Sequence, residues 1–300
     1  MVVVLSLFDG MSCGQVALKR AGIKIDKYFA SEIDKYAIQV TQKNHPNTIQ
    51  LGSVTEIDGN KLPKIDLLIG GSPCQSFSRV GDGSGFDGKS KLFFEFVRIL
   101  KETKPKFFLL ENVEMKKEWE DIITKEMGVK PIKINSSFLS AQNRPRIYWT
   151  NIPNITIPKD KGLLIQDILE NNALFSKEYP NYLDLEFCGR KRKDMVQDKT
   201  KKASCLTASM YKGQVSSFCK DSQGRVHKYT PIECERLQTL PDNYSDCVSN
   251  TQRFKMLGNG WTVDVISHIF SFIPRLEEKS EGRTSIPPTI IMAGILEVIL

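Results

Sequence analysis

A cysteine and a glutamate each stand at a point in the chain where a side chain could take part in catalysis. Cys74 follows Pro73, just past an apolar run over residues 65–69 that two glycines are expected to end. A thiolate is a strong nucleophile, and nearby positive charge favours it over the thiol. Glu111 ends a second apolar run, where a carboxylate is costly unless it has a function or a partner. Taken alone, Cys74 would more often be a small buried hydrophobic residue.

Two arginines form a third candidate group. Gln142, Arg144 and Arg146 alternate along an extended segment, so their side chains share one face. Two guanidiniums on one face need anions or carbonyls as partners. Arg144 could serve in a structural salt bridge, and a nearby positive charge such as that of Arg146 would favour a reactive thiolate.

The elements that must position these groups follow from the apolar pattern. Short apolar runs over residues 2–7, 28–30, 65–69 and 106–110 predict buried strands. In an open parallel sheet, ligands bind beyond the carboxyl ends of the strands. We therefore expect an α/β fold that brings Cys74 and Glu111 to one sheet edge.

A turn after the first strand is typical of a nucleotide site. Residues 8–14 lead into a helix near Gln15, although they do not form the dinucleotide motif Gly-x-Gly-x-x-Gly. Glu32 stands 22 residues after Gly10 and suits a carboxylate that accepts hydrogen bonds from ribose hydroxyls. It could equally be a solvated charge at a strand end.

Taken in order over residues 2–273, these motifs resemble the cytosine-C5 DNA methyltransferases. The family's nucleophile lies in a Pro-Cys-Gln motif before a flexible loop, here Cys74 and residues 81–88. The resemblance implies that Cys74 adds to C6 of a cytosine flipped out of duplex DNA. Glu111, in the Glu-Asn-Val motif, would contact N3 and the exocyclic amine. The motif Gln-x-Arg-x-Arg, here residues 142–146, completes the implied catalytic set, with Arg146 the better candidate for the active site.

The same resemblance implies S-adenosylmethionine as the cofactor and a Rossmann-like methyltransferase fold. Many family members carry an acid where Ser53 stands, and serine can still accept a hydrogen bond from adenine. Asn259 precedes a final apolar helix, which implies that the chain returns to complete the sheet domain. The implied cofactor-binding residues are Phe8, Asp9, Gly10, Gly14, Glu32, Ile33, Ser53, Val54, Pro73, Leu92 and Asn259.

The charge is concentrated in one segment. The net charge is +7, and residues 188–228 hold eleven Lys and Arg against three Asp, a balance of +8. Such a concentration suits the neutralisation of nucleic-acid phosphates. We expect a catalytic domain over residues 1–151 and 229–274 and a small irregular target-recognition domain over residues 152–228. Residues 275–300 form a tail with no assigned role.

Two local patterns lie late in the chain. Thr230, Pro231 and Glu233 form a capping box that predicts a helix reaching Leu240. A second helix is expected over residues 265–272. The segment 206–214 resembles a family segment that lies along the DNA, but its Thr and Gln residues could be ordinary turn residues.

Composition narrows the function classes further. Seven cysteines stand at wide spacings with no Cys-x-x-Cys, so neither a zinc site nor a disulfide framework is expected. No secretory signal is visible, and the apolar residues 289–300 are too few to span a bilayer, so we expect a cytoplasmic protein.

Duplex DNA is the partner that the resemblance implies, and a cognate restriction endonuclease could accompany the enzyme. A monomer suffices on an asymmetric site. Two other functions stay open: a tRNA cytosine-5 methyltransferase, which shares the fold and the catalytic residues, and a catalytically idle DNA-binding regulator. The presence of Cys74, Glu111 and Arg146 together argues against the idle regulator.

Overall fold

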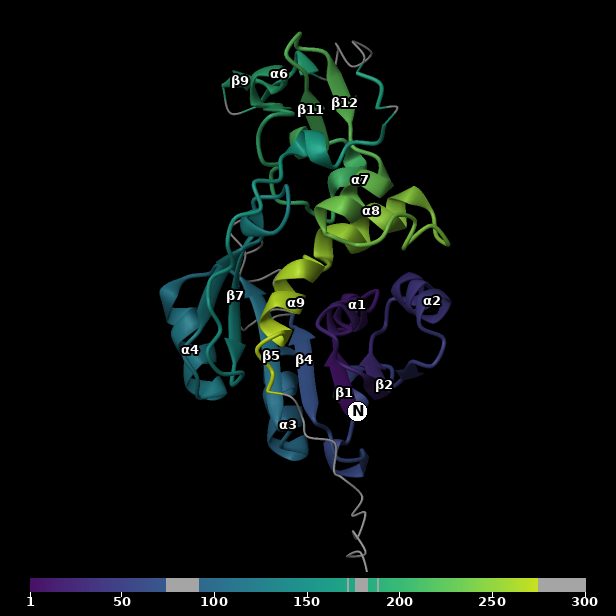
Figure 1. The fold of residues 1–300 in the computed structure, drawn as a ribbon, viewed down its shortest axis with the longest axis vertical. Helices are drawn as coiled ribbons and strands as arrows, with labels where there is room; N and C mark the ends of the chain where they lie inside the picture. The colour runs from purple at the N-terminus through teal and green to yellow at the C-terminus, as the bar shows by residue number, and fades with distance from the viewer. Residues whose placement is uncertain (74–91, 172, 176–182, 188, 275–300) are drawn as a thin grey trace, which may run out of the picture.

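A computed structural model describes residues 1–73, 92–171, 173–175, 183–187 and 189–274. Figure 1 shows a large sheet with its helices in the lower part of the molecule and a smaller unit above it. Cys74, residues 81–88 and the tail 275–300 lie outside the described residues. Their predicted roles therefore rest on the sequence.

A seven-stranded sheet forms the core of the lower part, in the order β3-β2-β1-β4-β5-β7-β6. The pairs from β3 to β5 are all parallel, and only β7 and β6 run antiparallel to their neighbours. The predicted α/β fold is confirmed. The strands are β1 (Val2–Leu7), β2 (Ile25–Ser31), β3 (Ile49–Gln50), β4 (Leu67–Gly71), β5 (Phe107–Val113), β6 (Ile132–Asn135) and β7 (Pro145–Thr150).

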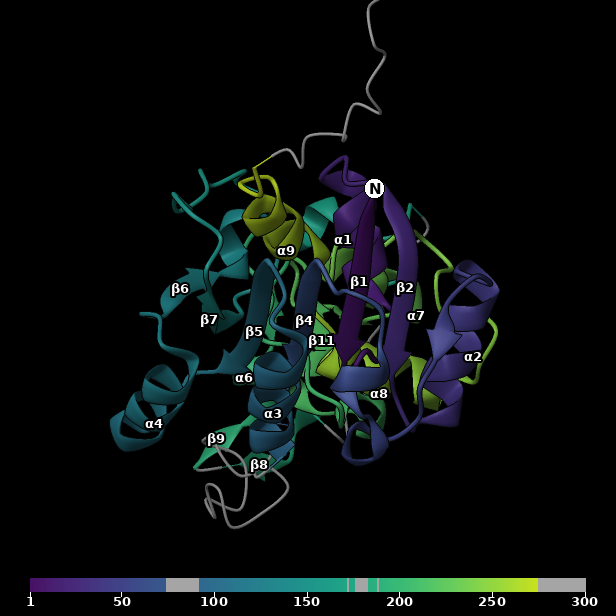
Figure 2. The ribbon, with the colours of Figure 1, turned by 90° about the horizontal axis from the view of Figure 1, so that it is seen from below.

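Helices cover both faces of this sheet. Successive strand residues point to opposite sides, so each strand contributes apolar side chains to a core on either face. Val4 of β1 belongs to the apolar core with α1 and α9, whereas Leu5 belongs to the core with α3 and α4. Figure 2 shows α1 and α9 on one side of β1 and β4, and α3 on the other. The helices beside the sheet are α1 (Cys13–Arg20), α2 (Lys35–Asn44), α3 (Phe93–Thr103), α4 (Lys117–Met127) and α9 (Val263–Phe270). Two more helices, α7 (Pro231–Leu237) and α8 (Asn250–Asn259), lie between the sheet and the upper unit in Figure 1.

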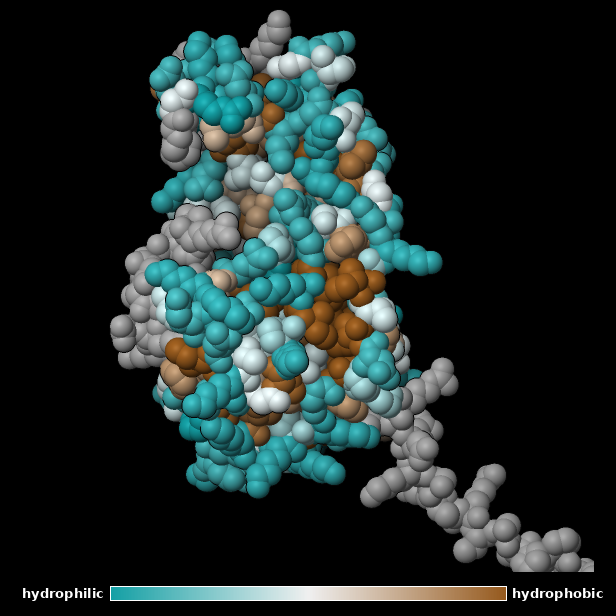
Figure 3. Space-filling model, turned by 90° about the vertical axis from the view of Figure 1, so that its left-hand side faces the viewer, coloured by the Kyte–Doolittle hydropathy of each residue, from teal (hydrophilic) through white to brown (hydrophobic). Residues whose placement is uncertain are grey.

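The upper unit is small and has few regular elements. It has a three-stranded sheet in the order β10-β11-β12 and a separate β8-β9 pair. A small core of Leu183, Val196, Phe218 and Val226 supports it, and its surface in Figure 3 is mainly hydrophilic. Its elements are β8 (Glu186–Phe187), β9 (Arg190–Lys191), α6 (Arg192–Met195), β10 (Gln197–Asp198), β11 (Phe218–Lys220) and β12 (Val226–Lys228).

Six short 3-10 helices join these elements. They are η1 (Val54–Glu56), η2 (Gly59–Lys61), η5 (Ser136–Phe138), η6 (Ile165–Asp167), η7 (Met210–Lys212) and η8 (Val215–Ser217), counted over the described part of the chain.

One strand end differs from the expectation. The two glycines after residue 69 do not end β4 but belong to it, since Gly70 pairs with Leu110 and Gly71 with Glu111. Gly70 is required by packing, because a Cβ there would lie 2.9 Å from the Leu7 carbonyl oxygen. The glycines therefore extend the strand to the sheet edge at a place where side chains would not fit.

The late helices begin as the sequence predicts or close to it. Thr230 Oγ accepts from the Glu233 N–H at 3.2 Å, and Glu233 Oε2 accepts from the Thr230 N–H at 2.9 Å, so the capping box is confirmed. However, α7 ends at Leu237, and its expected extension to Leu240 is wrong because Thr239 adopts a left-handed φ of 53°. The final helix covers residues 263–270 in place of 265–272.

Candidate active site

A cavity of about 310 Å³ opens at the carboxyl edge of the sheet, where β1, β2, β4 and β5 end. Its size falls at the lower end of the range for small-molecule sites. Nine of the predicted site residues line it: Phe8, Asp9, Gly10, Glu32, Pro73, Glu111, Arg144, Arg146 and Asn259. The other lining residues are Met11, Cys13, Asp34, Ala37, Gly71, Ser72, Val113, Met256, Gly258, Gly260 and Trp261.

Glu32 braces the turn after β1. Its Oε2 accepts from the Gly10 N–H at 2.8 Å, and its Oε1 accepts from the N–H groups of Ile33 and Asp34 at 2.7 and 2.8 Å. Gly10 has a φ of 58°, which a glycine adopts without strain. A carboxylate offers about four lone pairs, so one on Oε2 is left for a ligand hydroxyl.

Asp9 is a half-buried acid of the cavity. Tyr28 OH donates to it at 2.7 Å, and Ser12 Oγ donates to its other oxygen. Burial raises the pKa of Asp9 to about 6, although these hydrogen bonds oppose the rise. Asp9 therefore changes its charge close to neutral pH.

The catalytic candidates Glu111 and Arg146 form an ion pair at the opposite side of the cavity. Arg146 Nε lies 2.9 Å from Glu111 Oε1, and both side chains are mostly buried. Burial lowers the pKa of Arg146, but the charge of Glu111, with further contributions from Cys205 and Tyr148, outweighs burial and the pKa is raised. A fixed guanidinium thus orients the carboxylate that faces the cavity.

Trp261 is a lining residue that the sequence reasoning missed. Its Nε1 donates to Glu111 Oε2 at 3.1 Å, so each oxygen of this carboxylate accepts one protein donor. Trp261 stands two residues after Asn259, between two helices. A large aromatic residue in a turn beside a predicted cofactor residue was the available signal.

Arg144 has a different environment from Arg146. Its Nη2 donates to the carbonyls of Gly258 and Gly260 at 3.0 and 2.8 Å, and its Nη1 donates to Leu206 O at 2.9 Å. The side chain is buried, and it joins the end of α8 to the segment before η7. Arg144 therefore holds backbone in place, which is closer to the structural alternative than to a contact with substrate.

A second thiol lies between the two arginines and was also missed. Cys205 Sγ is 3.2 Å from Arg144 Nη1 and 3.8 Å from Arg146 Nη2. Burial would raise the pKa of Cys205, but the two guanidiniums outweigh it and the pKa is lowered. By contrast, burial raises the pKa of Cys13 in the cavity wall to about 12, so that thiol stays protonated.

Two predicted residues are buried in the scaffold and do not line the cavity. Gln142 is fully buried, where its Nε2 donates to Leu237 O at 3.1 Å and its Oε1 accepts from Leu206 N at 2.8 Å. Gly14 is a packing position, since a Cβ there would lie 2.6 Å from Ile69 Cδ1. Gln142 and Gly14 therefore belong to the buried scaffold and not to the cavity lining.

Four more predicted residues stand outside the lining. Ile33 is 78% exposed, although its N–H contacts Glu32. Ser53 caps η1 by accepting from the Thr55 N–H at 3.3 Å, and Val54 is buried in the core below. Leu92 packs against the same core just before α3.

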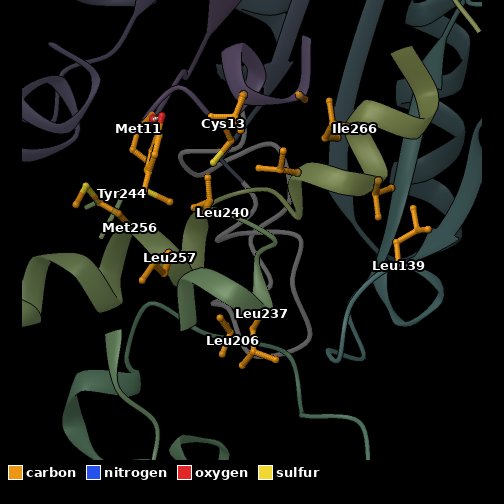
Figure 4. Close-up of a cluster of buried hydrophobic side chains, with 14 of the residues drawn as sticks. Met11, Cys13, Leu139, Leu206, Leu237, Leu240, Tyr244, Met256, Leu257 and Ile266 are labelled. Carbon is orange, nitrogen blue, oxygen red and sulfur yellow. Dashed lines mark hydrogen bonds between the residues drawn. The ribbon is translucent and has the colours of Figure 1, made fainter. Parts of the chain in front are cut away.

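An apolar layer supports one wall of the cavity. Figure 4 shows Met11, Cys13 and Met256 pointing toward one another, with Leu240 beside them. Tyr244 OH donates to the Met11 carbonyl at 2.8 Å and ties α1 to the chain before α8. The cavity thus combines an apolar wall with acidic groups.

This donor set fits S-adenosylmethionine. The cofactor is a cation with ribose hydroxyls, and Asp9 and Glu32 supply a carboxylate for each kind of group. Within the described residues, no cluster of three His, Cys, Asp or Glu side chains could hold a metal ion. Nor is any helix in those residues both long and apolar enough to cross a membrane.

Comparisons with known proteins place the chain beside DNA methyltransferases. The family model described as C-5 cytosine-specific DNA methylase matches residues 2–275. The type II methyltransferase M.NlaX of Neisseria lactamica is 30% identical over 294 residues, which cover 89% of this chain and 94% of that protein. M1.ScrFI of Lactococcus lactis subsp. cremoris is 29% identical over 310 residues, 93% of this chain and 79% of that protein.

Solved structures share the fold at lower identity. The Entamoeba histolytica methyltransferase EhMeth has a TM-score of 0.74 at 20% identity, covering 91% of this chain and 97% of that one. A putative DNA modification methyltransferase encoded within an Escherichia coli prophage has a TM-score of 0.68 at 19% identity, covering 91% of this chain and 98% of that one.

Proposed function

The chain belongs to the C-5 cytosine-specific DNA methylase family, and we propose that it transfers a methyl group from S-adenosylmethionine to C5 of a flipped-out cytosine in a short duplex DNA sequence. The observation that carries the proposal is one cavity with the acids Asp9 and Glu32 at one side and the Glu111 and Arg146 pair at the other. This arrangement offers a place for a cationic cofactor next to a place for a polar base.

In this proposal the cofactor binds in the part of the cavity next to the carboxyl ends of β1 and β2. Methyltransferases generally use S-adenosylmethionine, which supplies an electrophilic methyl group when bound. Asp9 would face its cationic part, and Glu32 has a lone pair left for a ribose hydroxyl. Phe8, Gly10, Pro73 and Asn259 complete the proposed cofactor residues at the lining.

In this proposal Cys74 and Glu111 activate the target cytosine. C5 of cytosine is a poor nucleophile until a group adds at C6, and a thiolate adds well near neutral pH. Cys74 would form this bond, while Glu111 would accept from the exocyclic amine and stabilise the proton at N3. C5 then takes the methyl group, and loss of the C5 proton with expulsion of the Cys74 thiolate restores the ring. The base must leave the stack for this, because its ring faces are covered in a duplex.

In this proposal the basic upper unit binds the DNA. We assign residues 152–228 to target recognition and residues 1–151 with 229–274 to catalysis. The support is the balance of +8 over residues 188–228 and the hydrophilic surface of that unit. A cytoplasmic monomer completes the proposal.

The test is base-resolution mapping of 5-methylcytosine in DNA from a methylation-free bacterial host that expresses the protein. We expect methylation at one short motif, and its loss in Cys74→Ala. A parallel assay compares purified protein on duplex DNA and on tRNA. A blank DNA map from folded, cofactor-binding protein, or transfer to tRNA alone, would refute the proposal.

A further inference from the structure

The indole of Trp261 holds the carboxylate oxygen of Glu111 that Arg146 leaves free. Trp261 Nε1 lies 3.1 Å from Oε2, and Arg146 Nε lies 2.9 Å from Oε1. Two N–H donors on different oxygens fix the plane of a carboxylate, whereas one donor alone would let it rotate about its last bond.

A glycine in the sheet leaves the space in which Trp261 contacts Glu111. Gly71 pairs with Glu111 across β4 and β5. A Cβ at Gly71 would lie 2.9 Å from Trp261 Nε1 and 3.0 Å from Glu111 Oε2. Any side chain there would separate the indole from the carboxylate, so the glycine keeps the two groups in contact.

The residues on either side of Trp261 are both held by hydrogen bonds. On the N-terminal side, the carbonyl of Gly260 accepts from Arg144 Nη2 at 2.8 Å and from Gln238 Nε2 at 3.1 Å. On the C-terminal side, Thr262 Oγ1 donates to Gln238 Oε1 at 2.8 Å. Gln238 is fully buried and Arg144 almost so. Both ends of the turn are therefore tied to buried side chains, and Trp261 can set the position of Glu111.

We infer that Trp261 is a positioning residue for Glu111, which it orients toward the cytosine. The inference rests on the proposed function, in which Glu111 receives the base. A carboxylate offers about four lone pairs, and Trp261 and Arg146 together use two of them. One lone pair on each oxygen stays free, which matches the two N–H groups of the cytosine edge, at the exocyclic amine and at N3 in the activated ring.

The first experiment compares Trp261→Phe with the wild-type enzyme. Phenylalanine keeps an aromatic wall in the cavity and removes the N–H donor together with the second ring of the indole. We expect the single-turnover rate of methyl transfer to fall about 10-fold, the lower end of the effect of losing an orienting hydrogen bond. The dissociation constant of S-adenosylmethionine, measured by calorimetry, is expected to change by less than about twofold.

A matched control separates this effect from the loss of any buried indole. Trp149 Nε1 donates to Thr124 Oγ1 at 2.9 Å, and this side chain is fully buried away from the cavity lining. Trp149→Phe removes the same kind of bond and is expected to keep the wild-type transfer rate. An equal loss in both variants would overturn the inference.

A double-mutant cycle tests whether Trp261 acts through Glu111. In a Glu111→Gln background, the additional effect of Trp261→Phe is expected to shrink to less than about twofold, because the oriented carboxylate is already absent. Full additivity of the two losses would overturn the inference, as would a wild-type rate in Trp261→Phe or a cofactor affinity that falls as much as the rate.

Gly71→Ala provides a second route if Trp261→Phe fails to fold. Its methyl group would enter the space between the indole and the carboxylate, and we expect the same loss of rate at unchanged cofactor affinity. A wild-type rate in this variant would count against the inference. Failure of the proposed function is distinguishable, because the wild-type enzyme would then form no 5-methylcytosine in DNA.

Discussion

Arg146 reaches Glu111 diagonally across the antiparallel pair of β5 and β7. The backbone of Arg146 pairs with Val113, two residues beyond Glu111, and its Nε still lies 2.9 Å from Glu111 Oε1. Residues two apart on a strand share a face, so the register itself brings the guanidinium to the carboxylate. The pair is thus set by the sheet and not by a loop.

We expect Arg146→Lys to lower the rate of methyl transfer by about 100-fold. Lysine keeps the charge but loses the planar donors that fix the carboxylate. Single-turnover transfer to duplex DNA measures the effect, and cofactor binding is expected to persist. Retention of the wild-type rate would show that charge alone suffices at this position.

Arg144→Lys is expected to act on stability. Three backbone carbonyls, those of Leu206, Gly258 and Gly260, accept from this buried guanidinium. A lysine cannot reach all three in the same geometry, and buried acceptors left without donors are costly. We expect the free energy of unfolding to fall by about 2 to 3 kcal/mol in urea titrations. Arg146→Lys is the matched control, with a smaller change in stability.

Cofactor affinity is expected to depend on the ionisation of Asp9. Burial raises the pKa of Asp9 to about 6, so the carboxyl is mainly protonated at about pH 5 and mainly ionised at about pH 7. A cationic cofactor binds the ionised form better, and its affinity should therefore rise over this interval.

Calorimetry at several pH values tests this dependence. Binding near pH 6 should also release protons, which is visible as a dependence of the heat on the buffer. Asp9→Asn should bind more weakly at neutral pH and show a flatter profile. A wild-type affinity that is constant from about pH 5 to about pH 7 would contradict the prediction.

The sequence predicted the sheet and most of the acidic groups because both depend on local pattern. Apolar runs identified the strands that deliver Glu32 and Glu111 to one edge, and this edge lines the cavity. The resemblance to a known family then supplied the proposed roles. Strand alternation placed Arg144 and Arg146 on one face but could not distinguish them, and the structure pairs Arg146 with Glu111.

Contacts between distant segments could not be predicted in this way. Trp261 reaches Glu111 across 150 positions of the chain, and Arg144 reaches Gly260 across 116. The apolar pattern predicts that Gly70 and Gly71 end a strand, whereas Gly71 belongs to β4 and a Cβ there would lie 2.9 Å from Trp261 Nε1. Such close approaches depend on the three-dimensional packing, for which periodicity carries no signal.

The junction of the upper unit with α7 gives a final prediction about pH and stability. His227 Nε2 lies 2.7 Å from Oε2 of Glu233, and both side chains are buried. Burial would lower the pKa of His227, but the hydrogen bond and charge of Glu233, with a further contribution from Glu170, outweigh it and the pKa is raised. The protonated histidine is therefore more favourable in the folded protein than in the unfolded chain.

A raised histidine pKa contributes stability that is fully present below about pH 6.5, and this contribution is lost as the pH rises through the folded value. We expect the wild-type protein to lose more thermal stability between about pH 6 and about pH 9 than His227→Gln does. His45→Gln is the matched control, since burial lowers the pKa of His45 to about 4 and leaves that ring neutral throughout this interval. The test is to measure the melting temperatures of the three proteins across this pH interval. Parallel curves for the wild type and His227→Gln would show that this ion pair does not stabilise the junction through the charge of His227.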